Sequence, residues 1–95
     1  MNGVAVEAVR SFMLDRLEGP LAAKRLTPRD VPDNFDLLTE GIIDSLGIVE
    51  LISAVEDQFD IEIDFEDLNA EELTIVGPFC RYIAKKSGDS NGGML

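Results

Sequence analysis

The sequence is poor in several residue types, and the absence of histidine matters most for catalysis. Its 95 residues include no histidine, no tryptophan and a single cysteine, Cys80. Without histidine, neither a Ser-His nor a Cys-His pair can form within the chain. Carboxylates are so numerous that no pair of them marks an acid–base site, and we expect no catalytic residues and no enzyme. With one cysteine, an intramolecular disulfide is impossible and nothing indicates an oxidising compartment. Cys80 falls on an apolar helical stripe, where we expect a small buried side chain.

Positive charge is scarce, and the middle of the chain has none. The sequence has 8 basic and 19 acidic residues, a net charge of −11, and between Asp30 and Cys80 it has 15 acids and no base. Such a field repels nucleic acid and anionic membranes and attracts basic protein surfaces. No apolar run approaches the roughly 20 residues that span a bilayer, and the N-terminus lacks a signal pattern. We expect a cytoplasmic monomer that binds neither nucleic acid nor membrane.

Apolar periodicity predicts helices over residues 4–17, 45–59 and 74–86, with a shorter turn around residues 66–70. Prolines punctuate the long connection between the first two helices, which we expect to contain a turn or two of helix of its own. The expected fold is all-α, a small four-helix bundle with a short third helix and a long loop between helices one and two. We expect one domain over residues 1–87 and a disordered tail over residues 88–95, which are rich in Gly, Ser and Asn.

The predicted helix over residues 45–59 has two distinct faces. At about 100° per residue, one face gathers the apolar residues expected to reach the core, which are Ile48, Leu51, Ile52, Val55 and Phe59. The opposite face combines apolar, polar and acidic residues: Leu46, Val49, Glu50, Ser53, Glu56 and Asp57. Large apolar side chains among carboxylates on an outward face are typical of a docking surface.

Asp44 and Ser45 stand where this helix begins. Both residue types cap helices, and we expect one of the two to do so here. A helix N-terminus also favours a phosphate, because its N–H groups are unpaired and its dipole is positive there. Asp-Ser-Leu alone favours a plain cap, but Ser45 in this position also suits a phosphate ester.

The stretch "GIIDSLGIVELISAVEDQFDIEI", followed by "LTIVGPFCRYI", resembles the acyl and peptidyl carrier proteins of the free-standing type. The resemblance covers roughly Phe35 to Ile83. It implies that Ser45 carries 4′-phosphopantetheine, transferred from coenzyme A by a phosphopantetheinyl transferase. It also implies that Asp44 belongs to the contacts with that transferase and with other partners.

The same resemblance implies a carrier that holds acyl or aminoacyl groups as thioesters on its arm. Such carriers pass their cargo between enzymes of fatty-acid, polyketide or nonribosomal-type synthesis. The implied partners are the transferase, an acyl- or aminoacyl-loading ligase, and synthases or transferases with basic docking surfaces. The mixed face listed above, from Leu46 to Asp57, matches the family's recognition face.

Two other interpretations assign the acids differently. Asp60, Glu62, Asp64 and Glu71 occupy positions 1, 3, 5 and 12 of a 12-residue loop, as in a calcium-binding EF-hand. Position 6 is Phe65 where the turn needs glycine, and the isoleucines Ile61 and Ile63 look like buried contacts, so we expect no metal site. The other interpretation is an acidic adaptor without a prosthetic group, in which Ser45 is a plain cap.

Overall fold

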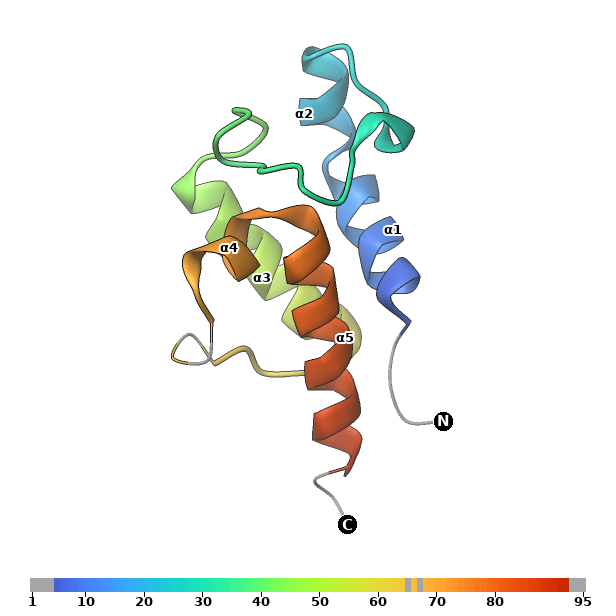
Figure 1. The fold of residues 1–95 in the computed structure, drawn as a ribbon, viewed down its shortest axis with the longest axis vertical. Coiled ribbons are helices and arrows are strands. Elements are labelled where there is room, and N and C mark those ends of the chain that lie inside the picture. The colour runs from blue at the N-terminus through green and yellow to red at the C-terminus, as the bar shows by residue number, and fades with distance from the viewer. Residues whose placement is uncertain (1–4, 65, 67, 93–95) are drawn as a thin grey trace.

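The computed structural model describes residues 5–64, 66 and 68–92. Five α-helices follow one another along the chain (Figure 1): α1 (Val6–Arg16), α2 (Glu18–Ala23), α3 (Ser45–Phe59), α4 (Ala70–Thr74) and α5 (Val76–Gly92). A 3-10 helix, η1 (Pro28–Asp30), lies between α2 and α3. Within the described residues there is no β-strand, only an isolated bridge between Asp36 and Ile75. The predicted all-α fold is therefore confirmed.

The core lies where α1, α3 and α5 meet. Helix α1 packs against α2, α3 and α5, and α4 packs against α5. The three long helices each turn one apolar stripe inward: Val9, Met13 and Leu14 from α1, Ile48, Leu51, Ile52 and Val55 from α3, and Val76, Phe79, Cys80 and Ile83 from α5. The connecting segments add further buried apolar side chains: Leu17, Leu21, Val31, Phe35, Leu37, Ile42, Ile61 and Ile63. Burial of these side chains is the main favourable term in folding so small a domain.

The observed helix bounds agree with the predicted ones best at α3, which spans residues 45–59 as expected. The long connection contains α2 and η1, so a helix within it is confirmed. The short turn predicted around residues 66–70 lies too close to the N-terminus, since the observed helix α4 begins at Ala70. Helix α5 begins at Val76 and continues to Gly92, so the end expected near residue 86 was wrong. Ser87 is only 4% exposed, which means that α5 is still packed where a glycine was expected to stop it.

Sequence reasoning also gave expectations for Cys80 and for the C-terminal tail. Cys80 is buried as expected, and burial raises the pKa of its thiol to about 11, which leaves it protonated at neutral pH. Residues 93–95 of the expected tail lie outside the described residues. The division into a domain over residues 1–87 and a tail stays a prediction.

The segment that leads to α3 is tied to the junction between α4 and α5. The N–H of Leu37 donates to the carbonyl of Thr74 at 2.9 Å, and the N–H of Val76 donates to the carbonyl of Phe35 at 3.0 Å. These two bonds join parts of the chain that are distant in sequence, on either side of the bridge described above. They hold the loop before α3 against the start of α5 (Figure 1).

Asp33 strengthens the same attachment from the side of the loop. Its carboxylate accepts a hydrogen bond from Arg81 at 2.8 Å and lies 3.9 Å from the guanidinium of Arg10. Arg10 also donates to the carbonyl of Val31. The N–H of Gly77 donates to the Asp33 carbonyl at 2.8 Å. Asp33 thus connects the loop to both α1 and α5 through backbone and side-chain bonds.

We predict that Gly77→Ala destabilises the protein through its contact with Asp33. A Cβ built on Gly77 would overlap the Asp33 carboxylate, which must then swing away from Arg81. We expect a loss of about 1 kcal/mol in the free energy of unfolding, measured by chemical denaturation. In an Asp33→Ala background the same substitution should be neutral or slightly stabilising, because alanine favours helix over glycine by about 1 kcal/mol.

The matched control for that prediction is Gly19→Ala. Gly19 is also helical, in α2, but a Cβ there would meet nothing within 4 Å. It should not lower stability in either background. Equal losses from Gly77→Ala with and without Asp33 would contradict the assignment of the close contact.

Candidate functional site

The loop before α3 begins with a turn closed by Asp36. One carboxylate oxygen of Asp36 accepts the N–H groups of Leu38 and Thr39, each at 3.0 Å. These bonds, chiefly the one from Thr39, hold the pKa of Asp36 below its usual value. The chain reverses at Gly41, whose φ of +75° is a conformation that glycine adopts without strain.

The chain then returns to the core before α3 begins. The N–H groups of Ile42 and Ile43 both donate to the carbonyl of Leu37, at 2.9 and 3.3 Å. The Ile42 side chain is buried. Because Leu37 is itself bonded to the α4–α5 junction, the position at which α3 starts is fixed by the body of the protein.

Asp44, rather than Ser45, caps α3. The Asp44 carboxylate accepts the N–H of Gly47 at 2.8 Å, and its backbone is extended, as N-cap residues usually are. Ser45 is the first residue of the helix and is exposed to solvent. Its hydroxyl is therefore not needed for the cap.

The start of α3 has the features that a phosphate ester requires. The first N–H groups of a helix have no carbonyl partner within it, and the helix dipole is positive there. Asp44 satisfies one of these N–H groups, that of Gly47, and the first turn of α3 contains no acidic residue. A phosphate ester on Ser45 would thus lie beside a positive helix end, with one carboxylate of Asp44 nearby.

The two faces of α3 are arranged as predicted, with two refinements. Leu46 and Val49 are 66% and 54% exposed, and Glu50, Ser53 and Asp57 are exposed beside them. The core face buries the first four of its predicted residues, whereas Phe59 at the end of α3 is only partly buried and packs edge-on against Phe12.

Glu56 is the second refinement. It was expected on the outward face, but it is half-buried and one of its carboxylate oxygens accepts the N–H of Ile63 at 2.8 Å. This bond fastens the segment after α3 back onto the helix. Glu56 therefore has a structural contact that periodicity alone could not indicate.

Sequence reasoning did not identify three residues that lie near the outward face of α3. Leu38, in the turn before α3, is 41% exposed. Phe12 and Arg16 from α1 line a shallow groove together with five residues of α3. Their position follows from the packing of α1 against α3, and no local signal in the sequence indicates it. We call Leu46, Val49, Glu50, Ser53 and Asp57 the docking face.

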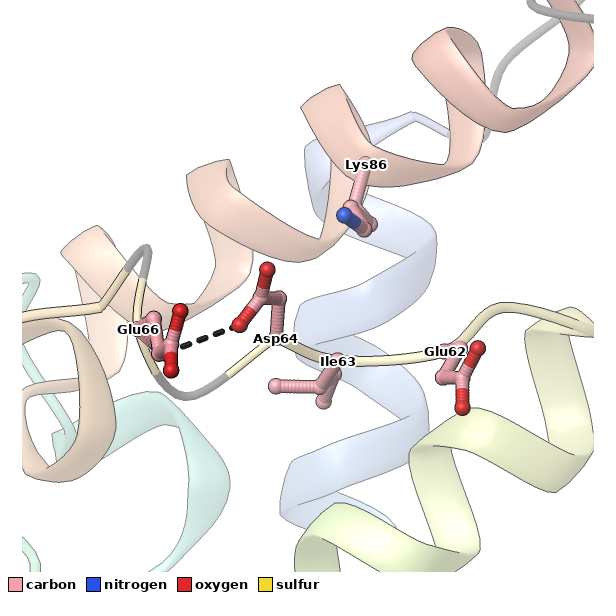
Figure 2. A pocket seen from close by; sticks show the side chains of 5 residues that line it. All are labelled: Glu62, Ile63, Asp64, Glu66 and Lys86. Carbon is pink, nitrogen blue, oxygen red and sulfur yellow. Dashed lines mark hydrogen bonds between the residues drawn. The ribbon is translucent and has the colours of Figure 1, made fainter.

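The acidic segment after α3 does not resemble a calcium loop in its described part. Ile61 and Ile63 are buried, as expected. The N–H of Glu66 donates to the Asp64 carboxylate at 2.9 Å, and Figure 2 shows these two residues together near Lys86, with Glu62 set apart from them. No group of three metal-binding side chains comes together among the residues described. Phe65 lies outside the described residues.

Among the described residues, no helix is both long and apolar enough to span a membrane.

Comparison with known proteins gives concordant matches. A family model described as "Phosphopantetheine attachment site" matches residues 22–83. The acyl carrier protein of Desulforapulum autotrophicum is 36% identical over 85 residues, which are 88% of this chain and all of that protein. The acyl carrier protein of a Picosynechococcus species is 34% identical over 88 residues, 93% of this chain and 98% of that protein. That of Buchnera aphidicola is 47% identical over 55 residues, 58% of this chain and 67% of that protein.

We predict that the two faces of α3 differ sharply in their contribution to stability. Leu51 is 5% exposed, and Leu51→Ala should cost about 2–5 kcal/mol in the free energy of unfolding, because it leaves a cavity in the core. Val49→Ala should change it by no more than about 0.5 kcal/mol. Chemical denaturation of both variants checks this, and similar losses for the two would refute the assignment of the faces.

Proposed function

We propose, from the premise that this chain belongs to the phosphopantetheine-bearing acyl carrier proteins, that Ser45 is the residue to which its arm is attached. Members of this family are carriers rather than enzymes, and their prosthetic group is 4′-phosphopantetheine. The observation that supports Ser45 most directly is its place at the start of α3. It is exposed there, and Asp44 performs the capping that would otherwise occupy a serine.

The residues around Ser45 suit the attachment chemistry. The positive end of α3 favours the negative charge of a phosphodiester on Ser45 and of the phosphate groups that approach it in coenzyme A. Asp44 keeps the first turn of α3 intact through its bond to Gly47, so the backbone of Ser45 is held at the start of the helix. When bound, the prosthetic group supplies a terminal thiol that carries the cargo as a thioester. The protein raises the effective concentration of that cargo at each partner enzyme.

We assign partner binding to the docking face. Leu46 and Val49 offer exposed apolar area, and Glu50 and Asp57 surround it with negative charge. Apolar contacts desolvate and hold a partner, while the charges accelerate the approach of basic surfaces. We propose that these partners are a phosphopantetheinyl transferase, an acyl- or aminoacyl-loading ligase, and synthases or transferases with basic docking surfaces.

The proposed setting is a cytoplasmic monomer that passes its cargo between enzymes of fatty-acid, polyketide or nonribosomal-type synthesis. The relatives named above are acyl carrier proteins, which favours an acyl over an aminoacyl cargo. Intact-mass analysis of the protein isolated from its native cell identifies the cargo class, because acyl and aminoacyl thioesters differ in mass and in charge.

We predict that Ser45→Ala abolishes attachment of the arm and leaves the fold intact. The wild-type protein, incubated with coenzyme A and a broad-range phosphopantetheinyl transferase, should gain the mass of one arm, whereas Ser45→Ala should gain none. Because Ser45 is exposed and does not cap α3, its substitution should shift stability by no more than about 0.5 kcal/mol.

Ser11→Ala is the matched control for this experiment, since Ser11 is an exposed helical serine in α1, outside the docking face, and its substitution should leave the modification unchanged. A wild-type protein that gains no mass, with the transferase active on another carrier, would favour the adaptor interpretation. A mass gain by Ser45→Ala would place the arm elsewhere.

We predict that Glu50→Lys slows recognition without unfolding the protein. It reverses an exposed charge on the docking face, so kcat/KM for the transferase should fall several-fold at low ionic strength, mainly through slower association. Added salt should narrow the difference between wild type and variant, because screening weakens steering. Asp15→Lys, the same charge change at an exposed site on α1, should have a much smaller effect. Equal losses for both variants would show that only the net charge matters.

A further inference from the structure

The groove between α1 and α3 lies along one edge of the docking face and combines both signs of charge. Its lining includes Phe12, Arg16, Glu50, Ser53, Ala54 and Asp57. The chain has no base between residues 30 and 80, so every cation beside the acids of α3 must come from another segment. Packing of α1 against α3 brings Arg16 to this position.

The guanidinium of Arg16 lies over an aromatic ring. Its Cζ atom lies 5.7 Å from the centre of the Phe12 ring. Phe12 is in turn fixed by Phe59, with ring centres 5.4 Å apart in an edge-to-face arrangement. Such a cation–π contact uses the charge of the guanidinium and leaves its N–H donors available for a carboxylate.

The carboxylates of the groove do not take up these donors. In the described part of the chain, the ion pairs formed by arginines involve Arg10, Arg81 and Asp33, and none joins Arg16 to Glu50 or Asp57. Arg16 is exposed, as are both acids. The groove therefore presents an oriented positive charge and separate negative charges to solvent at the same time.

We propose that this groove docks a basic partner enzyme whose contact surface carries one carboxylate opposite Arg16. Basic side chains of the partner pair with Glu50 and Asp57, and the partner's carboxylate pairs with the guanidinium of Arg16. A uniformly basic surface meets like charge at Arg16 and is disfavoured, so the arginine selects among partners that the acids alone would attract. The inference rests on the proposed carrier function and adds a specificity-determining residue to it.

The test uses the full-length protein bearing its arm and a set of synthetic amphipathic helical peptides as probes. The parent peptide has leucines on one face and lysines on the other, and in each further peptide one lysine is replaced by glutamate. Dissociation constants are measured by fluorescence anisotropy at low ionic strength. For wild type, glutamate should weaken binding about two- to fivefold at most positions, the range typical of exposed ion pairs. At the position that faces Arg16 it should not weaken binding at all.

Two charge-reversed variants decide whether Arg16 causes that exception. Arg16→Glu should remove it, so that glutamate weakens binding at every position. Arg29→Glu makes the same change in net charge at an exposed arginine of η1, outside the groove, and should keep the exception. Arg16→Ala should give an intermediate pattern and a melting temperature close to that of wild type.

Three results would overturn the inference. The first is a wild-type scan in which glutamate weakens binding equally at every position, and the second is an exception that persists in Arg16→Glu. The third is concentration-dependent self-association in sedimentation equilibrium that Arg16→Glu abolishes, because the occupant would then be a second copy of this chain. None of these readouts measures attachment at Ser45, so failure here is distinct from failure of the proposed function.

Discussion

The hydrogen bond from the Gly47 N–H to the Asp44 carboxylate sets the register of α3, on which the candidate site depends. With Asp44 as the cap, Ser45 becomes the first helical residue, while the apolar spacing of the helix decides which of its faces is buried. Leu51 then points into the core and Val49 points out of it. Had Ser45 been the cap, its hydroxyl would be engaged with the backbone and unsuited to esterification. One side-chain choice thus separates the structural role of the cap from the chemical role of the serine.

That cap is useful only because the chain is delivered to it in a fixed position. The loop before α3 has little regular structure, yet its backbone is bonded to Thr74 and Val76, and Asp33 ties it to Arg81. These attachments give hydrogen-bond partners within the protein to backbone groups that would be costly to bury unpaired. They fix the position of the start of α3 relative to α5, although the two helices are distant from each other in the sequence. Ser45, the proposed attachment residue, is thereby positioned by the body of the fold, as sites of group transfer require.

The structure also explains which expectations sequence could support. The bounds and faces of α3 were predictable because its apolar period is strong and its capping residues are local signals. Glu56 was assigned to the outward face because periodicity cannot register its bond to Ile63, a residue beyond the helix. The contact of Asp33 with Gly77 and the position of Arg16 depend on tertiary packing, which a single sequence does not encode locally. The end of α5 was misplaced because burial of Ser87 outweighs the helix-breaking tendency of a following glycine.

Basic residues are scarce in this chain, and three of its arginines differ in how they are placed among the acids. Fifteen acids without an intervening base repel one another in the compact state, so the acidic surface lowers stability rather than raising it. Surfaces of this kind are useful in association, where the same field accelerates the approach of basic partners. Arg10 and Arg81 form intramolecular ion pairs with Asp33 and so hold the loop before α3. Arg16 takes part in none of the ion pairs found among the described residues. Its guanidinium lies over the Phe12 ring at the edge of the docking face. A cation kept oriented beside acids that it does not neutralise adds a repulsive element to an attractive surface, which is how an interface tells related partners apart.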